Sequence, residues 1–229
     1  MRAIGSAVAA VVLAALTAAA AAPAAPAAPA APAPATVLRG AAAAAKMRAT
    51  LGATTRIRAN FQQTVSDGRG AVVQRSSGSF TAEQPRRLNW QVRSPSAQSL
   101  ITDGDRIWLY DPDLAQVTVG VLDTETAEAP MLILSGQVGT LTSKYDISAE
   151  GGGSNWRFVM KLRSAAVTRG PSFEQLTLEV VDGDVRAMHI RDTLEQRTDV
   201  MLSAVEHPAQ VDARLFHFVI PAGVEVVQR

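Results

Sequence analysis

Three histidines, His189, His207 and His217, are the side chains of this sequence best suited to acid–base catalysis or metal binding. The chain has no cysteine, and no two histidines have the His-x-x-x-His spacing that places two metal ligands on one face of a helix. His189 and His217 fall in segments with strand-like composition, and His207 precedes a proline. We interpret all three as ordinary surface or strand histidines, and we expect no metal site and no cofactor.

Three pairs of aspartates, each separated by one residue, could bring two carboxylates to one cation. The pairs are Asp103/Asp105, Asp111/Asp113 and Asp182/Asp184. Each pair falls in a predicted turn, where Asp is favoured because its carboxylate accepts hydrogen bonds from nearby main-chain N–H groups. None is followed by a calcium-binding loop with a terminal Glu. We therefore interpret the pairs as turn residues rather than as cation ligands.

Motifs for other chemistry are also missing. Residues 76–79 (Ser-Ser-Gly-Ser) lack the Gly-x-Ser-x-Gly nucleophile motif, and no Gly-x-x-x-x-Gly-Lys phosphate loop occurs. Lys and Arg total 22 and Asp and Glu total 21, without a basic block or a basic stripe interleaved with aromatic residues. We therefore expect neither an enzyme nor a nucleic-acid-binding protein.

The N-terminal region has the composition of an export signal followed by a linker. In residues 1–22, Arg2 precedes an alanine-rich apolar run with Ala-x-Ala sites, the layout of a cleaved signal peptide; a membrane anchor is the alternative. Residues 23–36 are rich in Ala and Pro and offer little area to bury, which predicts a disordered linker. Residues 37–229 have the size of one domain. Without a cysteine, this domain has neither a disulfide nor an N-terminal lipid anchor.

The elements that would position a site are mostly strands. Residues 37–51 predict a helix with Leu38, Ala42, Ala45 and Ala49 along one side, and residues 130–134 predict a second helix. Strands are predicted at 57–65, 71–81, 87–92, 98–101 and 106–110, and a further strand follows the Tyr110-Asp111-Pro112 corner and ends at 119. The remaining strands are predicted at 144–148, 156–163, 173–181, 185–192, 197–205 and 214–219. About eleven short antiparallel strands with two or three helices indicate a mainly β (α+β) fold, a strongly curved sheet or incomplete barrel with helices in its concave side.

Residues 98–119 are the most informative of these strands. Asp103-Gly104 predicts a type I′ hairpin turn, and Asp182-Gly183 predicts a second hairpin. Ile107, Trp108, Leu109 and Tyr110 are consecutive, so the strand at 106–110 is apolar on both faces. Because the short connections force antiparallel pairing, no crossover helix covers the second face. That face must meet a lid, a partner or a ligand.

Several strands and the predicted helix at 130–134 carry more apolar residues than one small core needs. We predict that these residues line a hydrophobic, non-catalytic cavity. An ordinary core is the alternative. The candidate residues are Phe61, Phe80, Leu88, Trp90, Leu100, Ile107, Leu109, Met131, Leu132 and Leu134.

A set of segments in this order resembles the LolA-type outer-membrane lipoprotein carriers. They are residues 59–63 (Ala-Asn-Phe-Gln-Gln), 78–80 (Gly-Ser-Phe), 85–90 (Pro-Arg-Arg-Leu-Asn-Trp), 99–104 (Ser-Leu-Ile-Thr-Asp-Gly), 107–112 (Ile-Trp-Leu-Tyr-Asp-Pro), 114–117 (Leu-Ala-Gln-Val), 130–134 (Pro-Met-Leu-Ile-Leu), 216–218 and 221–224. Each segment is short, but together they span nearly all of residues 37–229.

The resemblance implies a periplasmic chaperone with an unclosed antiparallel β-barrel and helices that form a lid over a hydrophobic cavity. Its expected partners are triacylated lipoproteins, an inner-membrane ABC transporter that releases them, and an outer-membrane receptor that is itself a lipoprotein. The missing cysteine separates this chain from that receptor. We expect a monomer. A lipid- or lipoprotein-sensing regulatory module of the same fold, with an extra domain or anchor, is the alternative, and an enzyme of lipid or glycan metabolism is a third.

One residue departs from the family pattern. Where the family commonly has an arginine before the proline of a strand entry, which holds the lid through helix carbonyls, this chain has Gln84. Arg86 and Arg87 follow Pro85 and are the expected substitutes for lid control, although they would point differently.

Overall fold

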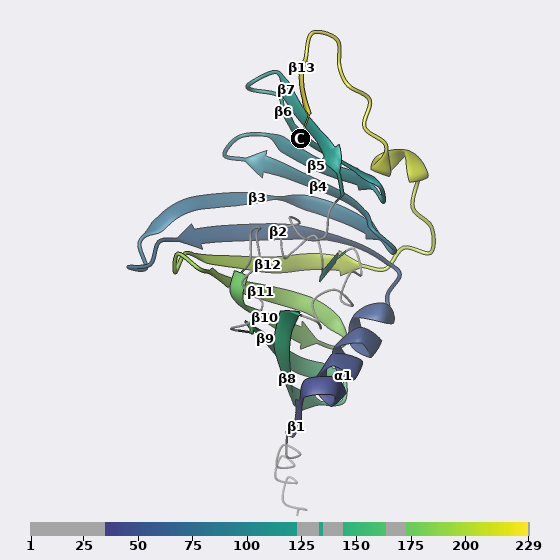
Figure 1. Ribbon diagram of the computed structural model, residues 1–229. Coiled ribbons are helices and arrows are strands. Elements are labelled where there is room, and N and C mark those ends of the chain that lie inside the picture. Colours follow the sequence, from purple (N-terminus) through teal and green to yellow (C-terminus); the bar gives the residue numbers. More distant parts are fainter. Residues whose placement is uncertain (1–34, 123–132, 135–143, 164–172, 229) are drawn as a thin grey trace, which may run out of the picture. The chain divides into compact units, whose positions relative to one another are not determined.

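The computed structural model describes residues 35–122, 133–134, 144–163 and 173–228 (Figure 1). The predicted signal peptide, nearly all of the predicted linker, and Met131 and Leu132 lie outside these residues. Ile133 and Leu134, from the predicted second helix, are helical and buried. Within the described ranges, none of the helices has the length and apolar character needed to span a membrane.

The described elements are thirteen strands, one α-helix and one short 3-10 helix. In chain order they are β1 Thr36–Arg39, α1 Gly40–Gly52, β2 Arg56–Ser66, β3 Val72–Glu83, β4 Arg87–Ser94, β5 Gln98–Asp103, β6 Arg106–Asp111, β7 Gln116–Val121, β8 Tyr145–Gly152, β9 Asn155–Leu162, β10 Phe173–Val181, β11 Asp184–Asp192, β12 Arg197–Glu206, η2 Ala213–Phe216 and β13 Glu225–Gln228.

All thirteen strands form one sheet, in the order β1-β8-β9-β10-β11-β12-β2-β3-β4-β5-β6-β7-β13. Neighbours pair antiparallel, except that β13 runs parallel to β7. The two edge strands, β1 and β13, do not pair with each other, so the sheet stays unclosed (Figure 1). The predicted mainly β, unclosed antiparallel architecture is confirmed, with thirteen strands rather than about eleven.

Helix α1 packs on β8 and contributes to the main apolar core. We call the sheet face that carries this core the inner face. The helix begins at Gly40, later than predicted, because residues 36–39 pair with β8 as a strand. Its buried residues are Ala43, Ala44, Met47 and Leu51. The predicted buried side was therefore wrong, because the run of alanines carries no periodic signal and Met47 and Leu51, one turn apart, determine which side faces the core.

The opposite, outer face of β5–β7 carries a second apolar cluster of Ile101, Trp108, Val117 and Val119. Residues 207–228, which we call the C-terminal segment, cover it: Phe218 lies 5.3 Å from Tyr110 between ring centroids, and the His217 ring meets Trp108 edge-on. The face of β6 that carries Trp108 and Tyr110 is therefore covered by the chain's own C-terminal segment. The other face carries Ile107 and Leu109 and belongs to the inner face, where the expectation that it meets a lid, a partner or a ligand stays a prediction.

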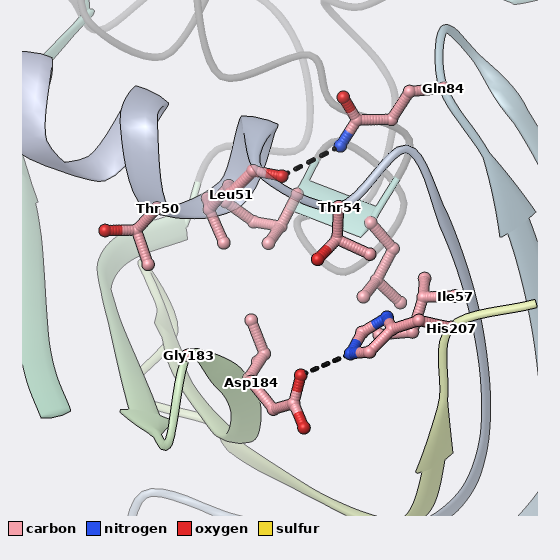
Figure 2. Close-up of a pocket in the computed structure, with 11 residues that line it drawn as sticks. Thr50, Leu51, Thr54, Ile57, Gln84, Gly183, Asp184 and His207 are labelled. Atoms are coloured by element: carbon pink, nitrogen blue, oxygen red, sulfur yellow. Dashed lines mark hydrogen bonds and ion pairs between the residues drawn. The ribbon is translucent and has the colours of Figure 1, made fainter. Parts of the chain in front are cut away.

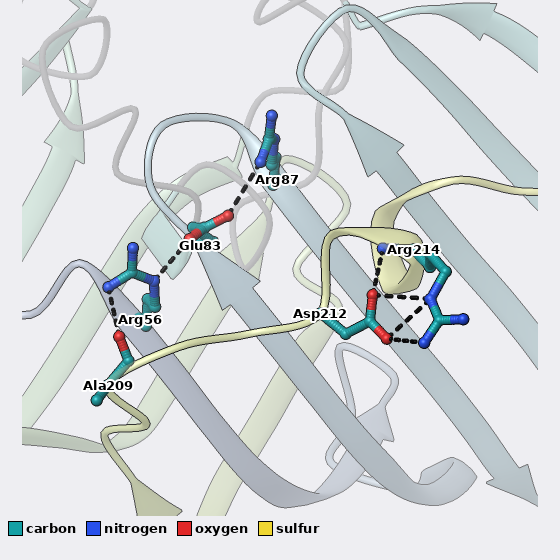
Figure 3. Close-up of polar contacts among 6 residues, drawn as sticks. All are labelled: Arg56, Glu83, Arg87, Ala209, Asp212 and Arg214. Atoms are coloured by element: carbon teal, nitrogen blue, oxygen red, sulfur yellow. Dashed lines mark hydrogen bonds and ion pairs between the residues drawn. The ribbon is translucent and has the colours of Figure 1, made fainter.

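The C-terminal segment is also tied to the outer face by polar contacts (Figure 3). Arg56 donates through Nη1 to the carbonyl of Ala209 at 3.0 Å and through Nε to Glu83 at 2.6 Å, and Asn89 donates to the carbonyl of Leu215 at 2.5 Å. These bonds connect β2, β3 and β4 to the segment. They lie on the outer face and leave the inner face to apolar residues.

Two local predictions require correction. Residues 214–219 were expected to form a strand, but Ala213–Phe216 is a 3-10 helix, because Asp212 accepts a hydrogen bond from the N–H of Arg214 and caps it. In the β5–β6 hairpin, Gly104 has a φ of 113° whereas Asp105 is not left-handed, the pattern of a type II′ rather than a type I′ turn. The predicted Asp182-Gly183 turn has positive φ at both residues, as type I′ requires.

Candidate functional site

The half of the inner face formed by β8–β12, β2 and β3 is densely packed. Phe158, Met160, Leu176 and Leu178 have no exposed surface. Three of the predicted cavity residues belong to this core and are only 1–2% exposed: Phe61, Phe80 and Leu88. Leu134 is also buried. These residues do share one face of the sheet, as predicted. They are packed within the core there and do not line an open cavity.

An aromatic stack marks the edge of the packed half. The Trp90 ring lies 3.9 Å from Phe61 and 5.4 Å from Phe80 between centroids, and both pairs are stacked. Phe61 reaches Trp90 because β3 carries Gly78 between them: a Cβ on Gly78 would lie 2.8 Å from the Phe61 ring. Sequence reasoning did not single out this glycine, although Gly within a strand often marks such a close approach.

Beyond the stack, the apolar side chains are progressively less covered. Phe80, Trp90, Leu100 and Leu109 lie directly opposite one another on β3, β4, β5 and β6. Phe80 is buried, Trp90 and Leu100 are half-buried, and Leu109 is 45% exposed. Ile107, on the same face of β6, is half-buried against the core. Trp90, Leu100, Ile107 and Leu109 therefore form a partly uncovered apolar surface, which we call the β4–β6 surface.

The end of α1 closes a small cavity against the sheet (Figure 2). Its volume is about 30 Å³, enough for water but far too small for an acyl chain. Gln84 donates through Nε2 to the carbonyl of Leu51 at 3.1 Å, and on the other side His207 bonds Asp184 at 2.5 Å. The remaining lining is mostly apolar and includes Leu51, Ile57, Ile133, Leu134 and Val185. An acyl chain would fit here only if these side chains moved apart.

The three residues predicted to control a lid have different contacts. Gln84 contacts α1, as described above, and Arg86 donates through Nη2 to the carbonyl of Leu122 at 2.9 Å. Arg87 instead donates to Glu83 at 3.0 Å (Figure 3). Hydrogen bonds from Arg56 and then from Arg87 lower the pKa of Glu83 below its usual value. Arg87 therefore belongs to the outer polar network rather than to the helix contact.

The candidate catalytic groups remain dispersed over the part of the chain described. His189 bonds Asp199 at 2.6 Å across β11 and β12, a pairing that sequence reasoning missed because the two residues meet only through strand register. Asp103 and Asp111 accept main-chain hydrogen bonds within their own turns, as predicted. Among the described residues, no three His, Asp or Glu side chains gather as a metal site would require.

An unclosed sheet with a partly uncovered apolar surface on one face is an architecture that can hold an apolar ligand. Comparison with known proteins narrows this class. The family model described as outer membrane lipoprotein carrier protein LolA matches residues 53–219. The chain belongs to this family. Its members bind lipoproteins in the periplasm and are not enzymes, so the predicted family, the carrier function and the non-enzymatic role are confirmed.

Several curated relatives share most of their length with this chain. The outer-membrane lipoprotein carrier protein of Pseudomonas paraeruginosa is 34% identical over 187 residues, covering 82% of this chain and 88% of the relative. The outer-membrane lipoprotein carrier protein of Chromohalobacter salexigens is 32% identical over 195 residues, which cover 85% of this chain and 91% of the relative. Among solved structures, a LolA superfamily protein from Nitrosomonas europaea matches with a TM-score of 0.45 and 10% identity, covering 76% of this chain and 97% of that protein.

Proposed function

We propose that this chain carries triacylated lipoproteins through the periplasm, from an inner-membrane ABC transporter to an outer-membrane lipoprotein receptor. The observation that supports this most directly is the row of Trp90, Leu100 and Leu109, whose side chains become less covered towards β6. Such a surface on the inner face, next to a packed core, is suited to receive an acyl chain. Residues 1–22 would be the cleaved export signal and residues 23–36 a linker to a monomeric carrier domain.

Free energy gives the reason for a carrier. Each methylene removed from water is worth about 0.8 kcal/mol, so an acyl chain of about a dozen carbons costs about 10 kcal/mol to expose. Lipoproteins therefore do not cross an aqueous compartment unaided at a useful rate. A protein that covers the chains with its own apolar residues removes most of this cost, and release becomes a transfer between two apolar surfaces.

The empty carrier would fill its own interior. In the part of the chain that the structure describes, Leu51, Ile133 and Leu134 line a cavity of about 30 Å³ beside the sheet, too small for an acyl chain. Cargo would then compete with α1 and its neighbours for the same apolar surface. Gln84 would control this step through its one hydrogen bond to α1, and Arg86 through its bond to Leu122.

The proposal is tested with the full mature chain and an acylated lipoprotein held in spheroplast membranes that contain the complete transporter. We expect a soluble one-to-one complex of carrier and lipoprotein to appear in the medium. Size-exclusion chromatography coupled to mass determination measures it. Lipoprotein that stays in the membrane, although a curated relative releases it under the same conditions, would refute the proposal.

A further inference from the structure

Arg86 is a cation with unused hydrogen-bond donors. Among the described residues, its guanidinium donates one bond, from Nη2 to the carbonyl of Leu122, while its buried Nε has no acceptor. Within the described part of the chain it forms no ion pair with a carboxylate. A buried N–H group without a partner is rare in a folded protein, and one explanation is a bound group that is not always present.

The position of Arg86 relates it to the β4–β6 surface. Arg86 directly precedes β4, and its carbonyl accepts a hydrogen bond from Thr102 on β5. Thr102 lies opposite Leu88 on one side and Ile107 on the other. Leu122, which directly follows β7, is anchored by its N–H to the carbonyl of Asp105 in the β5–β6 turn. The side chain of Arg86 therefore extends past one end of strands β4–β7, at the border of the apolar surface.

An acylated cargo brings polar atoms to such a border. Its chains are joined to glycerol and to the terminal amine through ester and amide carbonyls, so chains in an apolar site draw these oxygens out of water. A carbonyl that loses water without gaining a donor destabilises the complex. A guanidinium offers five N–H groups in a planar fork, and Arg86 already holds one carbonyl, that of Leu122.

We propose that Arg86 binds the ester or amide carbonyls at the head of the acyl chains, and that the Leu122 carbonyl occupies part of the same fork when cargo is absent. This inference rests on the proposed carrier function and adds a recognition element to it. The apolar surface would bind any long alkyl chain, and Arg86 would distinguish chains that carry a carbonyl at the head. Arg86 would thus determine specificity within the cargo site.

Two matched probes separate these contributions: a peptide that begins with S-diacylglyceryl cysteine, and an analogue in which ether links replace both esters and the alkyl chains are equal. Isothermal titration of the full mature chain measures both dissociation constants. We expect the ester probe to bind about tenfold more tightly than the ether probe, as for a hydrogen bond to a charged donor. In Arg86→Met the ratio of the two dissociation constants should fall to about one; the ratio is the readout, because loss of the bond to Leu122 shifts the affinity for both probes alike.

Arg93→Met is the control, because Arg93 bonds Ser79 on the outer face and its loss removes the same charge. It should keep the preference for the ester. If Arg86→Met does not fold, Arg86→Lys replaces it, since lysine keeps the charge but lacks Nε, and it too should lose most of the preference. The inference is wrong if Arg86→Met keeps the preference for the ester probe, or if its affinity for both probes falls by the same factor. If the wild type binds neither probe, the carrier proposal itself fails.

Discussion

The side-chain amide of Gln84 donates a hydrogen bond of 3.1 Å to the main-chain carbonyl of Leu51. It joins the turn between β3 and β4 to the last turn of α1, where carbonyl groups have no partner within the helix. The resemblance to the LolA family had assigned a helix contact of this kind to an arginine. Here a neutral amide makes such a contact to α1, and the arginine two residues later bonds Leu122 instead.

Replacing Gln84 with Glu should loosen the end of α1. The side chain keeps its size but becomes an acceptor that faces the Leu51 carbonyl, so the hydrogen bond is lost and a repulsion takes its place. We expect the local opening free energy of α1 to fall by about 1–3 kcal/mol. Hydrogen exchange of the α1 amides measures it, with the β9 and β10 amides as internal reference. Equal exchange in both proteins would show that the bond does not hold the helix.

Charge on the β4–β6 surface should impair cargo binding without unfolding the domain. Leu109→Glu places a carboxylate on an inner-face position that is 45% exposed, so the fold tolerates it, but an acyl chain would have to cover it. We expect acyl-probe affinity to fall at least about tenfold. Met201→Glu is the matched control, being 50% exposed but on the outer face of β12, and should bind normally. Equal behaviour of the two variants contradicts the proposed surface.

Leu88→Glu should behave differently, because Leu88 is 1% exposed within the core. A buried carboxylate without a partner should destabilise the domain by about 3 kcal/mol or more. Urea denaturation measures this loss. A stable Leu88→Glu variant that fails only in cargo binding would return Leu88 to the set of cavity residues that the sequence predicted.

Gly78→Ala should be among the most destabilising small substitutions. The added Cβ would lie 1.9 Å from the carbonyl oxygen of Gln91 on β4, and it would also press on the Phe61 ring. Backbone in a paired strand cannot move away cheaply, so we expect a loss of about 3 kcal/mol in unfolding free energy, measured in urea. Gly52→Ala is the control: its Cβ meets nothing within 4 Å, and stability should change by less than about 0.5 kcal/mol.

Acid should weaken the outer polar network through Glu83. Hydrogen bonds from Arg56 and Arg87 lower the pKa of Glu83 in the folded state below 4.5. The stabilisation is therefore complete above the unfolded-state pKa and is lost as the pH falls through the lower folded-state pKa. Glu83→Gln should be less stable than wild type by up to about 1 kcal/mol at neutral pH, with the difference vanishing in acid. A constant difference from pH 7 to pH 3 would argue against this origin.

Alkali should act through Tyr145, whose ring stacks on Phe173 at 4.5 Å in the core. Burial raises the pKa of Tyr145 from 10.0 to about 12. The unfolded chain releases this proton first, so stability should decrease as the pH rises from 10 towards 12. Tyr145→Phe should remove this part of the decrease in a denaturation series across that range. An unchanged slope in the variant would show that other groups cause it.

The sequence by itself determined the family, the strand-rich architecture and most strand positions. Strand alternation and turn residues are local signals, and they located the hairpins around Gly104 and Gly183. The number of predicted strands and the short connections between them were sufficient to predict a mainly β sheet. The ordered matches from residue 59 to residue 224 identified a lipoprotein carrier, because a set of short motifs in a fixed order is far more specific than any one of them.

Only the tertiary structure decided which apolar residues remain uncovered. Phe61 and Leu109 look equivalent in sequence, yet one is 1% exposed and the other 45%, because burial depends on strand order and on where α1 packs. Both faces of β6 are apolar in sequence, and only the C-terminal segment, which covers Trp108, distinguishes the outer face from the inner one. Gln84 and Leu51, or His189 and Asp199, meet through contacts between distant elements, which no periodicity along the chain encodes.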